Sequence, residues 1–377
     1  MEIPFSFRDT VDSQNFTGYS KECDDIVSHL RDSKNVVVTS PRKWGKSSLL
    51  NKALSALVSS DSSIRICRIG LFNLRDELSF YTLLVQEVLK AVSSSWEDAV
   101  ENLKCYLPES AADVAVGKSS LDQFRIVLDG RKVADIRDIL WRLPERVASE
   151  KGCRMVVMVD EFANVADFAD ADAFLNRMCC YWADCPGVSF CLSGCRRSLM
   201  TGWFGESGIH ASFGEFISLG KIDGNDLCTM VKEKFTLSGK YIDDEACSMM
   251  VSLVDSHPYY IQQLAQLSWL RTYVVCTSDI VADAYESLLD QLNLVFTSLT
   301  ETMTDQQIRY INALICGESV LSTSEVLHRY GITSATSASR SKSALLQREI
   351  VDMVAGKMTV QDPMYAGWLR KRYFIHR

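Results

Sequence analysis

The chain has 377 residues, of which 47% are apolar and 23% charged, with 19 Gly and 7 Pro. This balance is typical of a packed globular protein, and it excludes a disordered, collagenous or coiled-coil chain. At roughly 100–200 residues per domain, the length allows two or three domains. The net charge of −8 argues against nucleic-acid binding over the whole surface.

The 13 cysteines are scattered through apolar segments and include no CxxC pair, and the closest cysteine groups have no His beside them. Zinc sites need Cys and His at short, regular spacing, so we expect buried, reduced thiols and a cytoplasmic protein. The first nine residues lack the apolar stretch of a signal peptide. No run approaches the ~20 apolar residues that span a bilayer, so we expect no membrane segment.

The first 220 residues alternate β-branched runs with helical periodicity. Strands are predicted over 36–39, 64–72, 154–159 and 188–192. Helices are predicted over 20–30, 46–54, 81–92 and 136–148. The segment 93–130 shows no clear pattern. Buried β-branched strands separated by helices predict an α/β fold with a parallel sheet.

From about Lys221 the strand signal ends and the periodicity is helical, over 226–235, 243–254 and 259–273. The C-terminal residues then predict three helices and a hairpin: 305–315, a helix starting at 322–325, 333–348, and strands at 350–353 and 357–360. This is the order of a winged helix. We therefore expect an α/β core over 1–220, a helical lid over 221–300 and a winged-helix domain over 301–377.

A phosphate-binding loop is predicted by Ser40-Pro41-Arg42-Lys43-Trp44-Gly45-Lys46-Ser47, which fits GxxxxGK[ST] except that Ser40 replaces the first Gly. In this motif backbone amides wrap the phosphates, Lys46 reaches the β/γ oxygens and Ser47 ligates Mg²⁺. The tripeptide GKS alone is a weak signal. A β-branched strand ends just before the loop, however, and a Leu-rich helix begins at the lysine. We assign residues 40–48, with Ser48, to nucleotide binding; a helix start in a loop that binds no nucleotide is the alternative.

A second element is the buried strand that ends in Asp160 and Glu161. Asp160 would lie beside the loop and hold Mg²⁺ through water. Glu161 would face the γ-phosphate and take a proton from the attacking water. The alternative is that the pair only caps the following helix.

The third element follows the strand 188–192, which we place between the other two. Ser193 would therefore lie near the γ-phosphate as a sensor of hydrolysis. Arg196 and Arg197 follow it, and two interpretations are open for them: contact with phosphate, in cis or from a neighbouring subunit, or a solvated loop.

With these elements in place, the sequence resembles the archaeal-type ATPase family, AAA-like P-loop NTPases of the STAND group. The resemblance covers nearly the whole chain. Its five parts are Phe16-Thr17-Gly18-Tyr19-Ser20-Lys21-Glu22 (FxGRexE), the loop and Ser48-Leu49-Leu50 (GPRRxGKTSLL), Val159-Asp160-Glu161-Phe162 with Leu192-Ser193-Gly194, Ser256-His257-Pro258-Tyr259-Tyr260-Ile261-Gln262 (GxPyylq), and Asp362-Pro363-Met364-Tyr365-Ala366-Gly367-Trp368-Leu369 (DPlfrxWLR).

The resemblance implies a switch that holds ATP or ADP with Mg²⁺ between the core and the lid, with the winged helix closing over it. It places Gly18 near the adenine and Pro258 against it. His257 would either approach the phosphates or only pack within the lid.

Three positions depart from the family pattern. Tyr19 stands where Arg is common, Ser40 replaces Gly, and Phe213-Gly214-Glu215 falls where many members have YGR. If that Arg assists hydrolysis, Glu215 predicts slow turnover. Ser40 matters less, because a small residue still lets the backbone turn.

The charge is uneven, since residues 301–377 carry 10 Lys plus Arg against 7 Asp plus Glu. DNA contact is chemically feasible through Arg340, Lys342, Arg348, Arg370, Lys371, Arg372 and Arg377. The expected recognition helix, however, offers mostly Ser and Ala for reading bases. We favour a lid or partner surface for this domain.

Three functions are therefore carried forward. The first is an ATP-binding, slowly hydrolysing switch that acts through a homo-oligomer or a protein partner. The second is a DNA-binding protein regulated by ATP. The third is a nucleotide-binding scaffold that has lost turnover.

Overall fold

The computed structural model describes residues 3–5, 17–115, 120–354 and 356–375. Its contacts divide the chain into two compact units. The N-terminal unit comprises residues 12–42 and 46–220, and the C-terminal unit comprises 1–11, 43–45 and 221–377. Phe16, part of the family resemblance, lies outside the described residues.

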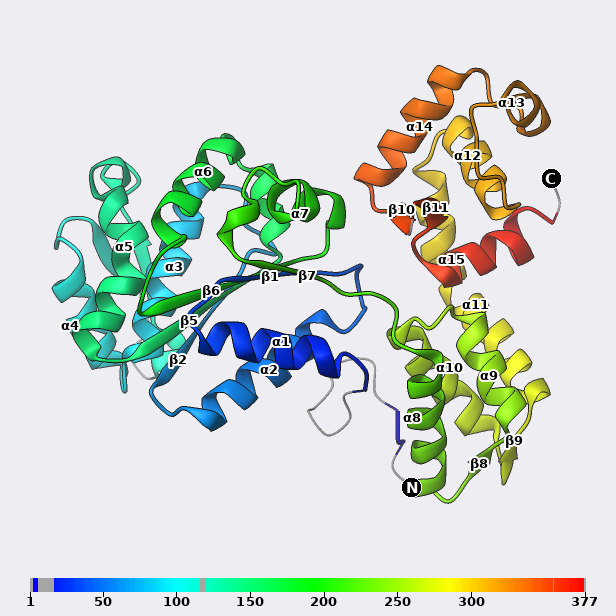
Figure 1. The fold of residues 1–377 in the computed structure, drawn as a ribbon, viewed down its shortest axis with the longest axis horizontal. Coiled ribbons are helices and arrows are strands. Elements are labelled where there is room, and N and C mark those ends of the chain that lie inside the picture. The colour runs from blue at the N-terminus through cyan, green and yellow to red at the C-terminus, as the bar shows by residue number, and fades with distance from the viewer. Residues whose placement is uncertain (1–2, 6–16, 116–119, 355, 376–377) are drawn as a thin grey trace. The chain divides into compact units, whose positions relative to one another are not determined.

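The N-terminal unit is built on a five-stranded sheet with the order β2-β5-β6-β1-β7 (Figure 1). Its strands are β1 (Val36–Thr39), β2 (Ile64–Gly70), β5 (Arg154–Asp160), β6 (Val188–Gly194) and β7 (Glu215–Ser218). Every neighbouring pair is parallel. The predicted parallel sheet is therefore confirmed, as is the position of β6 between β1 and β5. The edge strand β7 was not predicted.

Helices cover both faces of this sheet (Figure 1). On one side lie α1 (Ser20–Arg31) and α2 (Lys46–Ser60); on the other lie α3 (Glu77–Val92), α5 (Val133–Lys151), α6 (Ala171–Trp182) and α7 (Arg197–Phe204). Aromatic rings pack between the sheet and the helices α3, α5, α6 and α7. The ring centroids of Phe80 and Phe174 lie 4.9 Å apart, and the Trp182 ring stacks on Phe190 with 4.1 Å between centroids. Burial of these large rings is what fixes β6, and hence the residues after it, against the helices.

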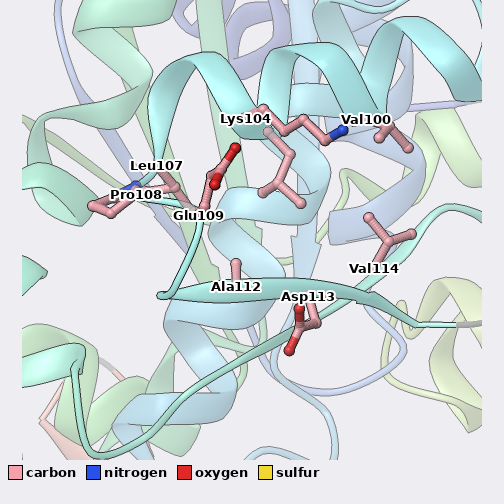
Figure 2. A pocket seen from close by; sticks show the side chains of 9 residues that line it. Val100, Lys104, Leu107, Pro108, Glu109, Ala112, Asp113 and Val114 are labelled. Atoms are coloured by element: carbon pink, nitrogen blue, oxygen red, sulfur yellow. The ribbon is translucent and has the colours of Figure 1, made fainter.

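The segment 93–130 forms α4 (Trp96–Tyr106), β3 (Ala112–Ala115), the 3₁₀ turn η2 (Leu121–Gln123) and β4 (Arg125–Leu128). β3 and β4 pair antiparallel outside the main sheet. A cavity of about 180 Å³ lies between α4 and β3, with Val100 and Val114 on opposite walls (Figure 2). All of the residues that line this cavity lie between 100 and 114, and none of them is a predicted site residue.

In the C-terminal unit the helices are α8 (Gly224–Leu237), α9 (Asp244–Leu253), α10 (Pro258–Arg271), α11 (Ser278–Glu301), α12 (Asp305–Ile315), α13 (Ser324–Tyr330), α14 (Ala335–Gln347) and α15 (Pro363–Trp368), the last continued by the π-turn η5 (Leu369–Tyr373). The hairpin β10 (Val351–Val354) and β11 (Lys357–Val360) follows α14. Three helices and a hairpin thus occur in the predicted order.

Two features of this unit differ from the sequence prediction. The expectation of no strands between residue 221 and the C-terminal hairpin was wrong, because β8 (Tyr241–Ile242) pairs with β9 (Val275–Cys276). Strands of two residues are too short to show a period of two. The helix α11, the longest of the described helices, was also not predicted.

None of the described helices combines the length and the apolar character needed to cross a membrane. The 13 cysteines form no disulfide, and seven of them are buried.

Candidate functional site: the loop after β1 and the ends of β5 and β6

The loop after β1 connects a fully buried strand to α2, which begins at Lys46 as predicted. Ser40 is buried, its N–H donates to the Gly194 carbonyl at 3.4 Å, and its hydroxyl donates to the Pro41 carbonyl at 3.0 Å. The left-handed backbone positions are Lys43 (φ 63°) and Gly45 (φ 87°). The φ of Gly45 lies further from the left-handed helical value that a side chain such as Lys43 adopts, which favours glycine there, whereas Ser40 has no positive φ and serine fits.

Three predicted site residues meet where β1, β5 and β6 end. Lys46 Nζ lies 2.5 Å from Asp160 Oδ1 and 3.1 Å from Ser193 Oγ. Ser193 in turn donates to Asp160 Oδ1 at 2.5 Å. Lys46 is only 5% exposed and Ser193 is fully buried. The predicted meeting of the three strand ends is therefore present in the structure.

The charges of this cluster reinforce each other. Burial lowers the pKa of Lys46, but the Asp160 carboxylate and the neighbouring Cys195 and Glu161 together outweigh burial and raise it. Burial raises the pKa of Asp160, but the Lys46 ammonium and the hydrogen bonds to the carboxylate outweigh burial and lower it. Both groups are therefore charged at neutral pH.

Glu161 has a left-handed backbone (φ 54°), and its N–H donates to Asp160 Oδ1 at 3.0 Å. It precedes the 3₁₀ segment η3 (Phe162–Asp167) without any side-chain capping bond, so the structure gives no support to the capping alternative for Glu161. The Cys195 thiol lies 3.3 Å from Glu161 Oε1. Burial raises the pKa of Cys195 to about 12. The thiol therefore stays protonated, and its S–H donates a hydrogen bond to the Glu161 carboxylate.

Arg196 forms an ion pair with Asp167, at 3.1 Å and 3.3 Å between the two nitrogen–oxygen pairs. Arg197 Nη2 lies 3.5 Å from Ser218 Oγ. Arg196 also lines a polar pocket with Glu161 and residues of the loop after β2. The sequence prediction missed Cys195 and the residues after β2. The carboxyl end of β2 meets the same edge of the sheet, and that is the signal that points to this loop.

Gly18 and Tyr19, from the opening segment of the resemblance, both have positive φ, 78° and 56°. The Tyr19 hydroxyl is buried, which raises its pKa, and it donates to the Gly220 carbonyl at 2.8 Å. An Arg at this position has no phenolic hydroxyl to make this bond. Tyr19 thus ties the start of α1 to the last residue of the N-terminal unit.

The segment Phe213-Gly214-Glu215 leads into β7. A Cβ on Gly214 would lie 2.4 Å from the Asn35 carbonyl oxygen, so no larger residue fits. Asn35 also donates to the Trp182 and Phe213 carbonyls. Gly214 therefore allows β7 to pair with β1, and Glu215 is exposed at the start of that strand.

In the C-terminal unit, α10 starts at Pro258, and His257, 4% exposed, precedes it as the N-cap residue. Proline suits the first position of a helix, where its missing N–H is not needed. The roles expected of Pro258 and His257 toward the nucleotide stay predictions.

Three of the seven basic side chains expected on the winged helix are engaged within their own unit, and Arg370 is exposed. Arg372 pairs with Glu286 at 2.7 Å and Asp290 at 3.1 Å, and Lys371 pairs with Glu286. Arg348 donates to the Thr302 carbonyl at 3.2 Å. The exposed cations on α14 are Arg340 and Lys342. Arg377 lies outside the described residues.

No protein-family model and no curated protein matches the sequence. Among solved structures, the Walker-type ATPase PABY2304 of Pyrococcus abyssi is similar, with a TM-score of 0.67 and 13% identity over 97% of this chain and 99% of the other. The ORC1 protein of Aeropyrum pernix in complex with DNA gives 0.49 at 12% identity, over 95% and 94%. RuvB of Thermotoga maritima gives 0.44 at 14% identity, over 97% and 98%. The chain has the fold of a Walker-type P-loop ATPase.

Proposed function

We propose that the chain binds ATP at the loop 40–48, hydrolyses it slowly and acts as a nucleotide-dependent conformational switch. The observation that carries this proposal is the cluster of Lys46, Asp160 and Ser193 at the carboxyl edge of a parallel sheet. A buried ammonium, a carboxylate and a hydroxyl beside a helix N-terminus are the groups that phosphoryl transfer requires. The Walker-type ATPase fold agrees with this chemistry.

The donor set also fits Mg²⁺, which prefers hydroxyl and carboxylate oxygens. Ser47 is the second residue of α2, and Asp160 accepts the bonds from Lys46, Ser193 and Glu161 through Oδ1, so Oδ2 is the atom a cation would approach. Mg²⁺, when bound, neutralises phosphate charge. Lys46 binds the β/γ oxygens, Glu161 takes the proton of the attacking water, and Ser193 senses whether the γ-phosphate is present.

Slow turnover is supported by two contacts that must break before ATP can be cleaved, one at Lys46 and one at Glu161. Lys46 has to exchange the Asp160 carboxylate, 2.5 Å away, for phosphate oxygens. Glu161 is held by the Cys195 thiol. Glu215 occupies the position at which the resemblance expects an arginine. A protein with slow exchange and slow cleavage suits a switch, whose output would pass to a second copy or a protein partner in the cytoplasm.

An ATP-regulated DNA-binding function is the alternative, and Arg340 and Lys342, both exposed on α14, favour it. The ion pairs of Lys371 and Arg372 with Glu286 count against it, because these cations are already neutralised. We therefore propose that the winged helix serves as a lid or a partner surface.

The proposal is tested by nucleotide binding to the full chain, wild type and Lys46→Ala, with Lys52→Ala as the control on the same helix. We expect Lys46→Ala to lower ATP affinity by at least about a hundredfold, because a charged phosphate contact is lost, and Lys52→Ala to change it little. Equal affinity of wild type and Lys46→Ala would contradict the assigned site.

A further inference from the structure

A polar pocket of about 200 Å³ opens beside Glu161 in the N-terminal unit. Its walls come from the loop after β1, the loop after β2, the segment after β5 and the residue after Cys195. The charged lining residues are Arg42, Arg75, Arg196, Glu161 and Asp167. The amides of Asn73 and Asn164 line the same small volume. Arg42 and Glu161 have roles proposed above, but none of those roles uses Arg75 or the two amides.

The charges of the pocket do not cancel. Arg196 pairs with Asp167 through two nitrogen–oxygen contacts. Counted over the lining residues, three arginines stand against the two carboxylates of Asp167 and Glu161, so the lining carries one net positive charge. Guanidinium groups match the geometry of tetrahedral oxyanions with two parallel N–H donors, which an ammonium cannot do.

The walls are held firmly to the end of β5. Asn164 Nδ2 donates to the carbonyls of Leu71 at 3.0 Å and Phe72 at 3.4 Å. The Leu71 N–H donates to the Asp160 carbonyl at 3.0 Å. The loop after β2 is therefore held to the strand end that carries Asp160 and Glu161, and Arg196 is held by Asp167, so part of the pocket is ordered before an anion binds.

We propose that this pocket, here called the arginine pocket, binds inorganic phosphate and is the site through which the phosphate product leaves. The volume is several times the ~30 Å³ that one water occupies in the liquid, enough for an ion of five heavy atoms. The binding of phosphate stands on the pocket alone. Its role as an exit rests on the proposed ATP hydrolysis.

Glu161 on the wall decides which anion fits. At neutral pH inorganic phosphate keeps at least one O–H, and that O–H donates to a carboxylate, whereas sulfate has only acceptor oxygens and is repelled. A site with guanidinium donors and one carboxylate acceptor therefore prefers phosphate to sulfate. Glu161→Gln removes the repulsion between the carboxylate and sulfate, so the affinities for phosphate and sulfate should become similar.

The experiment measures inorganic phosphate binding to the full chain by ³¹P NMR line broadening, in the Lys46→Ala background so that the loop ammonium cannot contribute. We expect saturable binding that weakens about tenfold or more in Arg75→Ala and Arg196→Ala, the size expected for loss of one charged hydrogen bond. Arg131→Ala is the matched control, since Arg131 pairs with Asp129 on the exposed surface of the same unit and lies outside the pocket.

Arg75→Gln serves as a second variant of the same position, and circular dichroism verifies that each protein is folded. The proposal is overturned by phosphate binding that does not saturate, by equal binding in Arg75→Ala and Arg131→Ala, or by sulfate that binds as tightly as phosphate. Each outcome is read without nucleotide.

A second arm measures phosphate as a product inhibitor of ATP cleavage by the chain with Lys46 intact. Weaker inhibition in Arg75→Ala supports the exit role, and unchanged inhibition removes it. If the chain binds phosphate but cleaves no ATP, the pocket stands and the proposed hydrolysis falls. If it cleaves ATP but the Lys46→Ala chain binds no phosphate, the pocket falls and the hydrolysis stands.

Discussion

Lys46, which is buried, and Asp160, which is partly exposed, form an ion pair with 2.5 Å between Nζ and Oδ1. The two residues lie 114 positions apart in the sequence and meet because β1 and β5 flank β6 in a parallel sheet. In the proposed mechanism the ammonium must move from this carboxylate to phosphate. The pair is thus both a structural contact and a competitor of the nucleotide.

This competition predicts the effect of Asp160→Asn. Without the carboxylate, Lys46 is available to phosphate, so nucleotide affinity measured with a metal chelator should rise roughly three- to tenfold. In Mg²⁺ the same variant should lose phosphate release, because the candidate metal ligand is gone. Isothermal titration with and without Mg²⁺ separates the two effects. A lower affinity in chelator would show that Asp160 does not compete for Lys46.

The ion pair also predicts a pH dependence of stability. The pKa of Asp160 is lower in the folded chain than the ordinary Asp value of 3.8. Its ionised form therefore stabilises the folded chain fully above pH 3.8, and this stabilisation is lost as the pH falls through the lower folded pKa. At neutral pH, Asp160→Asn leaves Lys46 buried without its counter-charge, which should cost about 3–5 kcal/mol of unfolding free energy. Urea unfolding should show this difference near neutral pH and a smaller one below about pH 4. A difference that stays constant with pH would contradict the pair.

The Cys195 thiol is expected to position Glu161. Cys195→Ala removes the donor and should lower the rate of ATP cleavage about three- to tenfold with little change in KM, whereas Cys195→Ser keeps a donor and should retain most of the rate. A rate loss in Cys195→Ser as large as that in Cys195→Ala would mean that Cys195 acts on packing and not as a donor to Glu161.

The basic C-terminal residues are expected to stabilise their own unit. Arg372→Ala breaks partly exposed ion pairs with Glu286 and Asp290 and should cost no more than about 1 kcal/mol. DNA affinity should not change with this substitution. If DNA binds at all, its salt dependence should fall with Arg340→Ala and Lys342→Ala instead. Fluorescence anisotropy of labelled DNA at several salt concentrations compares Arg372→Ala with Arg340→Ala and Lys342→Ala. A large loss of DNA binding in Arg372→Ala would favour the DNA-binding function.

The core of the fold could be predicted because its signals are local. The strands β1, β5 and β6 are continuous β-branched or apolar runs, and the loop and α2 follow β1 with the spacing of a phosphate-binding motif. Lys46, Asp160 and Ser193 were placed together because parallel strands end at one edge. Helix α1 ended within one residue of its predicted position.

The missed elements depend on contacts that the sequence does not show. β7 is a strand because Gly214 lets the chain pass Asn35 closely enough to pair with β1. Among the described strands, β3 and β4 pair with each other and not with the main sheet, and each has only four residues. The arginine pocket joins four loops, so Arg75 and Asn164 become neighbours of Glu161 only once the sheet order is known.

The central claim is that this chain hydrolyses ATP through Glu161 after binding it through Lys46. The most direct measurement is single-turnover phosphate release from ATP by the wild-type chain, Lys46→Ala and Glu161→Gln, together with the nucleotide recovered from each after denaturation. The account predicts slow release in the wild type, no nucleotide bound to Lys46→Ala, and ATP retained uncleaved by Glu161→Gln. Wild-type protein that binds no nucleotide, or Glu161→Gln that releases phosphate at the wild-type rate, would contradict it.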